Sequence, residues 1–140
     1  LFRSELGVDA VLETLEKMES GERPVPQKED GATRAAKLSR EEAQIDWNNS
    51  AQVISAKIRA FTSHPGAWTH FRGAPIKLWK PVVTEYVLPA GEVSLIDKAV
   101  HIGTATSALQ IGEVTTAGKP AMSAAAWANG ARLVAGERCE

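Results

Sequence analysis

The chain has 140 residues, 44% of them hydrophobic, and a formal net charge of −1. This composition suits one domain with a hydrophobic core, and it excludes the overall basic charge that marks many nucleic-acid-binding domains. No apolar run reaches about 18 residues, so we expect no membrane-spanning helix and no membrane partner.

Residues 4–20 are predicted to form an amphipathic helix. Charged residues occupy one side of it, and Gly21 stands where a C-terminal cap belongs. The apolar side repeats at helical spacing, and its residues are Val8, Val11, Leu12, Leu15 and Met18.

A linker is predicted next, because residues 22–31 hold two prolines, a glycine and several charges and so cannot build a core. The charge balance changes along the chain. Residues 1–36 contain five basic and eight acidic residues, a balance of −3, whereas residues 37–140 contain eleven and nine, a balance of +2. An excess of +2 is compatible with a nucleic-acid surface, although it is more often ordinary surface charge.

A capping box is predicted at Ser39 and Glu42, since a hydroxyl and a carboxylate at this spacing can each accept a hydrogen bond from the other residue's backbone. Any helix there is short, because residues 46–49 do not continue it. Ser50 is predicted to cap a second helix that ends at Phe61. Its buried face is expected to comprise Val53, Ile54, Ile58 and Phe61.

The second helix is followed by Thr62-Ser63-His64-Pro65-Gly66. Proline cannot continue a helix and also restricts the residue before it, and glycine adopts backbone angles that other residues avoid. This turn is therefore predicted to convert the helix into the first strand of a sheet.

Five short strands with small connections are predicted after the turn, at residues 67–71, 76–83, 92–96, 99–103 and 108–114. A last helix is predicted from Ala124 to Asn129, capped by Ser123 and ended by Gly130. The predicted fold class is mainly β with flanking helices, built around a small closed barrel of five or six short strands.

The remaining chemistry-bearing residues give little sign of a catalytic or metal site. Cys139 is the only cysteine, so no internal disulfide is possible, which favours a reducing, cytoplasmic compartment. The histidines, His64, His70 and His101, lack metal-ligand spacing with carboxylates. The four tryptophans are expected mainly in the core.

Several stretches, taken in order and spacing, resemble the C-terminal half of the methionyl-tRNA formyltransferases, a family of transferases in translation initiation and one-carbon metabolism. The resemblance spans nearly the whole chain. The stretches are KLSREEAQIDW at 37–47, IRAF at 58–61, PGAW at 65–68, IKLW at 76–79 and QIGEVTTAGKPAMSA at 110–124.

The resemblance implies that residues 1–20 are the last helix of an N-terminal formyltransferase domain, residues 21–49 a linker, and residues 50–140 an OB-like barrel domain. The implied partners are initiator methionyl-tRNA and the catalytic domain of the same polypeptide. The implied co-substrate of the full enzyme is 10-formyltetrahydrofolate. No catalytic, cofactor-binding or metal-binding residue is carried over, so this chain alone is expected to lack the catalytic centre.

Five cations are the candidate tRNA-binding residues: Lys37, Arg40, Arg59, Lys77 and Lys119. Cations one helical turn apart can meet adjacent phosphates, and OB-type folds bind nucleic acid through basic and aromatic side chains. Arg72 and Lys80 are further candidates. The alternation of residues 77–80 puts a cation on each face of the strand and does not single out a binding face, so solvated surface charge stays an alternative for all of them.

Two other functions stay open at this point. The chain could be the barrel domain of a related folate-dependent formyltransferase or hydrolase that acts on a sugar nucleotide or on formyltetrahydrofolate, and such a barrel needs no tRNA face. It could also be a free-standing barrel that binds a protein or single-stranded nucleic acid.

Overall fold

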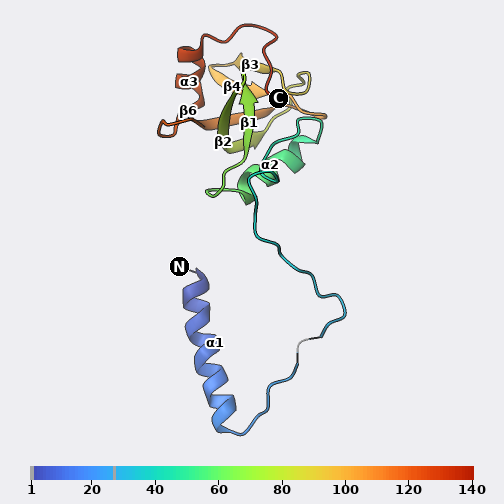
Figure 1. Cartoon of the computed structure of the whole chain (residues 1–140), viewed down its shortest axis with the longest axis vertical. Helices are drawn as coiled ribbons and strands as arrows, with labels where there is room; N and C mark the ends of the chain where they lie inside the picture. Colours follow the sequence, from blue (N-terminus) through green and yellow to red (C-terminus); the bar gives the residue numbers. More distant parts are fainter. Residues whose placement is uncertain (1, 27) are drawn as a thin grey trace. The chain divides into compact units, whose positions relative to one another are not determined.

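A computed structural model describes residues 2–26 and 28–140, and the chain divides into two compact units between Ala36 and Lys37. The first unit contains the predicted helix, α1 (Phe2–Glu19) (Figure 1). It ends in a pair of capping hydrogen bonds, from the Gly21 amide to the Met18 carbonyl (3.1 Å) and from the Glu22 amide to the Lys17 carbonyl (2.9 Å).

The predicted apolar side of α1 is exposed. All side chains from Leu6 to Glu19 are exposed, and Met18, for example, keeps 65% of its surface accessible. The described residues between Glu22 and Ala36 form no helix or strand, as the composition of this segment predicted. Among the described helices, none combines the length and the apolar character that crossing a bilayer requires.

The second unit is a curled antiparallel sheet with two helices, which confirms the predicted mainly β class (Figure 1). The strands follow the order β1-β2-β5-β4-β3, and β6 pairs with β5. Each predicted strand occurs close to its expected bounds. The elements are α2 (Ala51–Ala60), β1 (Trp68–Phe71), β2 (Ala74–Val83), β3 (Val93–Ile96), β4 (Ala99–Ile102), β5 (Leu109–Thr116), β6 (Met122–Ser123) and α3 (Ala124–Ala131).

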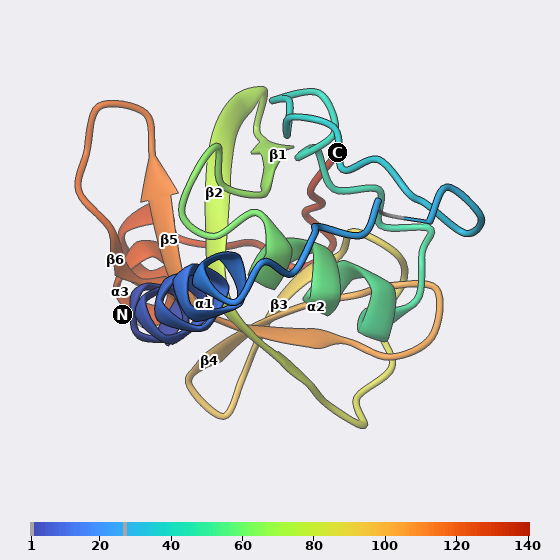
Figure 2. The same cartoon turned by 90° about the horizontal axis from the view of Figure 1, so that it is seen from below.

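The sheet curls where the two longest strands, β2 and β5, bend together (Figure 2). Lys80 lies within β2 but has a left-handed backbone conformation (φ 54°), and it lies against Gly112 of β5. A Cβ on Gly112 would stand 2.9 Å from the Lys80 Cβ, so only glycine permits this approach. The bend turns a flat ladder into an open half-barrel.

The last residues of the chain bridge the two edges of the curled sheet. The amide of Val93, at the start of β3, donates to the Glu137 carbonyl (2.8 Å), and the Cys139 amide donates to the Gly91 carbonyl (2.8 Å). On the other edge, His70 of β1 and Glu140 exchange two hydrogen bonds of 2.9 Å. Residues 137–140, here called the closing segment, therefore satisfy backbone groups on both sheet edges.

Residues 43–47 also pack into the barrel unit. Ala43, Ile45 and Trp47 are buried, and the Ile45 amide donates to the Trp68 carbonyl (2.8 Å). The buried Thr69 hydroxyl accepts a hydrogen bond from the Trp47 indole (3.0 Å) and donates to the Glu140 carbonyl (2.8 Å). A polar network thus joins this segment, β1 and the closing segment.

The capping predictions were confirmed by hydrogen bonds. The Ser39 and Glu42 side chains each accept a hydrogen bond from the other residue's amide, at 3.1 and 2.9 Å, although they stabilise a turn rather than a helix. Ser50 caps α2 by accepting from the Val53 amide, and Ser123 caps α3 by accepting from the Ala126 amide.

Two predicted details were wrong. Val53 is 54% exposed, because the buried positions of α2 start at Ala51 and recur at Ile54, Ser55 and Ile58, a face that excludes Val53. Gly130 does not end α3. The helix runs on to Ala131, and the left-handed residue is Arg132 (φ 49°).

Candidate nucleic-acid interface

A cavity of about 620 Å³ opens on the outer face of β1 and β2. Its walls come from six parts of the barrel unit: the turn after Ser39, the turn that follows α2, the strands β1, β2 and β5, and the connection between β5 and β6. We call it the rim pocket. Its lining residues are Arg40, His64, Pro65, Trp68, Pro75, Lys77, Thr115, Thr116, Ala117, Gly118 and Lys119.

The turn after α2 forms one wall because Gly66 lets it lie directly on β2. Gly66 has φ +84°, and a Cβ there would stand 2.6 Å from the Trp79 ring and 3.0 Å from the Lys77 side chain. Its amide donates to the Phe61 carbonyl (3.0 Å), which fixes the turn to the end of the helix. The sequence Pro65-Gly66 therefore shapes the pocket as well as ending α2.

Strand β2 separates its two faces at the pocket. Ile76 and Leu78 are buried in the core, whereas Lys77 and Trp79 are half-buried on the outer face. The sequence pattern alone could not choose between these faces. The burial of Ile76 and Leu78 shows that the face of Lys77 and Trp79 is the one available for binding. On this face the Trp79 indole donates a hydrogen bond to the Thr115 hydroxyl (2.8 Å).

Arg40 is positioned by the capping-box turn and by Trp68. The Trp68 indole donates to the Arg40 carbonyl (2.8 Å), and the Arg40 guanidinium lies over the same indole, 5.4 Å from the ring centroid. This cation–π stack holds a flat cationic group at the pocket mouth.

The rim cations have no acidic partner. None of Arg40, Lys77 and Lys119 forms an ion pair with a described residue, and no carboxylate lines the pocket. Their charge is therefore free to meet an anion.

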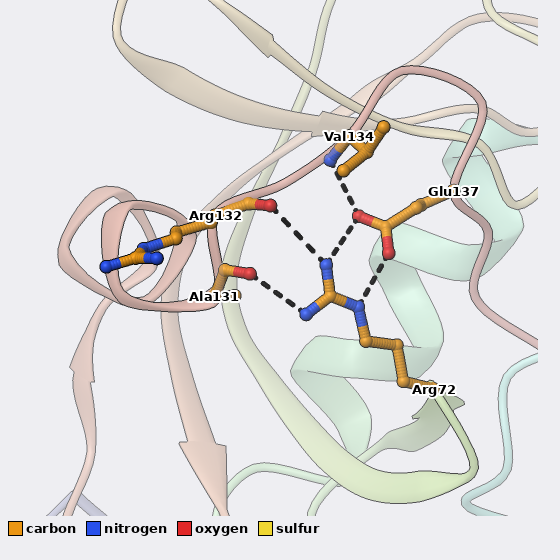
Figure 3. Close-up of polar contacts among 5 residues, drawn as sticks. All are labelled: Arg72, Ala131, Arg132, Val134 and Glu137. Atoms are coloured by element: carbon orange, nitrogen blue, oxygen red, sulfur yellow. Dashed lines mark hydrogen bonds and ion pairs between the residues drawn. The ribbon is translucent and has the colours of Figure 1, made fainter.

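Two other candidate cations are already paired. Figure 3 shows Arg72 bound to both carboxylate oxygens of Glu137 (2.6 and 2.9 Å) and to the carbonyls of Ala131 (2.9 Å) and Arg132 (3.5 Å). Lys80 is paired with Glu113. Their expected part in an exposed cationic face is not supported, since these side chains join parts of the barrel unit.

Arg72 and Glu137 each stabilise the charged form of the other. Hydrogen bonds from Arg72 and from the Val134 amide (2.8 Å) lower the pKa of Glu137 below its ordinary value. The same carboxylate raises the pKa of Arg72. Both groups therefore stay ionised around neutral pH.

The predicted tRNA-binding residues fall into two sets. Arg40, Lys77 and Lys119 meet at the rim pocket. Lys37 and Arg59 are exposed but do not line it. The aromatic and proline walls were not predicted as site residues. Trp68 and the other tryptophans were expected mainly in the core, although a tryptophan can also stack on a base.

Other chemistry-bearing groups do not assemble into a reactive centre. Within the described residues, no three His, Cys, Asp or Glu side chains come together in a way that could hold a metal ion. Burial raises the pKa of the Cys139 thiol to about 12, so it stays protonated and unreactive near neutral pH. Trp47 and Trp127 are buried, as predicted for core residues, whereas Trp68 and Trp79 are half-buried beside the pocket.

The model of the formyl transferase C-terminal domain family matches residues 37–132, which includes every part of the rim pocket. The chain belongs to this family. The matched range starts at the residue where the second compact unit starts. The resemblance noted in the sequence is thereby confirmed for the formyl transferase C-terminal domain.

Curated relatives of this formyl transferase domain carry the name methionyl-tRNA formyltransferase. One from Mycobacterium sp. (strain KMS) is 42% identical over 133 residues, which cover 93% of this chain and 43% of that protein. One from Neisseria gonorrhoeae (strain ATCC 700825 / FA 1090) is 41% identical over 137 residues, which cover 96% of this chain and 44% of that protein. The chain thus spans less than half the length of these relatives.

A solved structure shares the fold. HypX from Aquifex aeolicus, in complex with tetrahydrofolic acid, superposes with a TM-score of 0.66 at 30% identity. The match covers 86% of this chain and 22% of HypX. The same fold therefore also occurs within a larger protein of another name.

Proposed function

We propose that this chain is the tRNA-binding C-terminal part of a methionyl-tRNA formyltransferase, which formylates the methionine of initiator tRNA with 10-formyltetrahydrofolate. The observation that carries this proposal is identity of 40% or more, over more than nine-tenths of the chain, to proteins of that name. HypX shares the fold at lower identity, so the fold alone does not select tRNA.

The rim pocket supplies the physical basis for tRNA binding. Arg40, Lys77 and Lys119 present unpaired positive charge from three separate parts of the barrel. Such cations bind backbone phosphates, and the release of counterions favours binding independently of base sequence. Lys37 and Arg59 would extend the contact as exposed cations outside the pocket lining.

The proposed role is to position the tRNA, while chemistry takes place elsewhere in the polypeptide. No carboxylate lines the rim pocket, and its one imidazole, on His64, is exposed. The catalytic domain of the same polypeptide would bind 10-formyltetrahydrofolate and transfer the formyl group. Fixing the tRNA would raise the effective concentration of the acceptor amine there.

The salt dependence of tRNA binding tests the proposal on the 140-residue chain. We expect initiator tRNA to bind at roughly micromolar levels or more weakly, with log Kd changing steeply with log salt concentration. Lys77→Gln and Lys119→Gln should each reduce the salt slope by about one. Lys98→Gln is the matched control, because Lys98 is an exposed lysine in the β3–β4 turn, away from the pocket lining. Equal slopes in all variants would contradict a phosphate contact at the pocket.

Kinetics of the full-length enzyme give a second test. Lys37→Ala combined with Arg40→Ala should raise KM for the tRNA more than it lowers kcat, because positioning contacts act largely as uniform binding. Unchanged KM at both low and high salt would remove these two cations from the mechanism. Turnover of a sugar nucleotide, with none of charged tRNA, would favour the related formyltransferases instead.

A further inference from the structure

We propose that the rim pocket holds one unpaired nucleotide of the bound RNA, with its base against the Arg40–Trp68 stack and its phosphate between Lys77 and Lys119. This inference rests on the proposed function, since it specifies what part of the tRNA the same surface takes. It goes further in requiring a base inside the pocket, whereas phosphate contacts alone require none.

The size and lining of the pocket favour a whole nucleotide over a phosphate alone. Its volume of about 620 Å³ lies within the range of about 300–1,000 Å³ that is typical of small-molecule sites. A phosphate alone would leave the lining residues Pro65, Trp68 and Pro75 in contact with water. A planar base covers such apolar walls, because its faces are apolar and its edges polar.

The Arg40 guanidinium already forms the plane on which a base can stack. It lies over Trp68, and the carbonyl of the same residue accepts the indole hydrogen bond, so one tryptophan fixes both ends of Arg40. RNA-binding proteins stack unpaired bases on aromatic rings and on guanidinium planes of this kind. No side chain of the described residues takes up Arg40's donors, which leaves the outer face of the guanidinium available.

Two lysines in the pocket lining suit the phosphate. Lys77 of β2 is the cross-strand partner of Trp68, so it lies beside the surface proposed for the base. Lys119 comes from the turn after β5, whose shape is fixed by a hydrogen bond from the Lys119 amide to the Thr116 carbonyl (3.1 Å). Both lysines are compact point charges that bind phosphate oxygens without requiring one orientation. The pocket thus combines a surface for a base with neighbouring cations for its phosphate.

The nucleotide must be unpaired. Bases within an A-form helix are stacked and paired, and the side chains of a protein reach mainly the backbone and the shallow groove. A helix laid over the pocket would contact its rim and leave its interior empty. An unstacked nucleotide in a loop, a bulge or a single-stranded end can enter it.

The test compares two single-stranded RNA hexamers that carry the same number of phosphates, one with bases and one abasic at its central positions. Binding of the fluorescein-labelled hexamers to the 140-residue chain is followed by anisotropy at fixed salt. Stacking of one base predicts that the hexamer with bases binds about 5- to 20-fold more tightly. Equal Kd values would overturn the inference. Binding of adenosine monophosphate alone as tightly as the hexamer would also overturn it, in favour of a free nucleotide.

Arg40→Lys locates the base effect without changing the charge. Lysine keeps the positive charge but has no stacking plane, so this variant should reduce the ratio between the two hexamers to about two or less while leaving the salt slope unchanged. Arg132→Lys is the matched control, because Arg132 is an exposed arginine outside the pocket lining and is not among the proposed tRNA contacts, and it should keep the full ratio. A ratio that survives Arg40→Lys would place the base elsewhere and overturn the inference. If intact tRNA still bound with a steep salt slope, the proposed function would stand even though the nucleotide pocket had failed. The two failures are therefore distinguishable.

Discussion

Arg40 and Arg72 each lie against an aromatic ring, but they differ in whether other groups of the protein bind the guanidinium. Both side chains are exposed, and each guanidinium lies over an aromatic ring, at 5.4 Å from Trp68 and 5.1 Å from Phe71. Arg72 gives its donors to Glu137 and to two backbone carbonyls, whereas the guanidinium of Arg40 has no acceptor among the described residues. Exposure and contact with an aromatic ring therefore do not distinguish a structural cation from one that is available to a ligand. The hydrogen-bond and ion-pair partners of the cation do.

The difference between the two arginines follows from where acceptors lie. At Arg72, the end of α3 supplies carbonyls and Glu137 of the closing segment supplies a carboxylate (Figure 3). At the rim pocket, the polar side chains in the lining other than the cations are those of His64, Thr115 and Thr116, and none of these is a carboxylate. Anion binding is therefore expected at Arg40, and stability is expected to depend on Arg72.

The largest effect is expected for Arg72→Ala on stability. It removes four hydrogen bonds that join the turn after β1 to the end of α3 and to Glu137 of the closing segment, so Tm should fall by on the order of 5 °C. Tryptophan fluorescence is the measurement, because all four tryptophans lie in the second unit and do not report on α1. Arg72→Lys should recover only part of the loss, because lysine has no planar fork. A Tm within about 1 °C of wild type would remove the contrast with Arg40.

The next effect concerns acid stability at Glu137. Its pKa is lowered in the folded state, first by the Arg72 side chain. The ionised carboxylate therefore stabilises the fold above the unfolded pKa of about 4.3, and this contribution is lost as the pH falls through the lower folded value. We expect Tm of the wild type to fall between about pH 5 and 3 more steeply than that of Glu137→Gln. Parallel Tm profiles would show that the network contributes nothing through ionisation.

Arg40→Ala should show the reverse pattern to Arg72→Ala. Loss of an exposed cation–π contact should lower Tm by no more than about 3 °C. The salt slope of tRNA binding should fall by about one, because one phosphate contact is removed. Titrations at several salt concentrations, together with a melting curve of the same sample, measure both. A large loss of stability with an unchanged slope would make Arg40 a structural residue like Arg72.

The smallest effect is expected for Lys80→Gln. Lys80 is paired, as Arg72 is, but its side chain is 69% exposed, and Glu113 is its one ion-pair partner among the described residues. Exposed single pairs contribute little, so Tm should change by less than about 2 °C, and the salt slope for tRNA should stay that of the wild type. A Tm loss as large as that of Arg72→Ala would mean that a single ion pair stabilises the fold as much as the four hydrogen bonds of Arg72.

The sequence predicted the features that depend on neighbours along the chain. Ser50 and Ser123 cap the helices they were expected to cap, and the Ser39–Glu42 capping box forms both of its hydrogen bonds. These interactions span three residues, so the local pattern contains both partners. The strands were similarly visible because turn residues separate them.

The features that the sequence did not predict join distant residues. Thr69 and Glu140, which are hydrogen-bonded, are 71 positions apart, and nothing local shows that the last residues bridge the sheet edges. Arg40, Lys77 and Lys119 were candidates by charge and family resemblance, but their convergence needed the folded sheet. Arg72 and Lys80 looked equivalent to them, because a sequence does not show which cations will meet a carboxylate.

The bridging of both sheet edges by residues 137–140 has a consequence for synthesis. A ribosome makes the strands before this segment, so the nascent barrel has strand edges with unpaired backbone groups until residue 140 has left the exit tunnel. The contacts that close it have long sequence separation, which slows folding. The incomplete chain is therefore the state most exposed to edge-to-edge aggregation, and it is the state that holdase chaperones would have to protect.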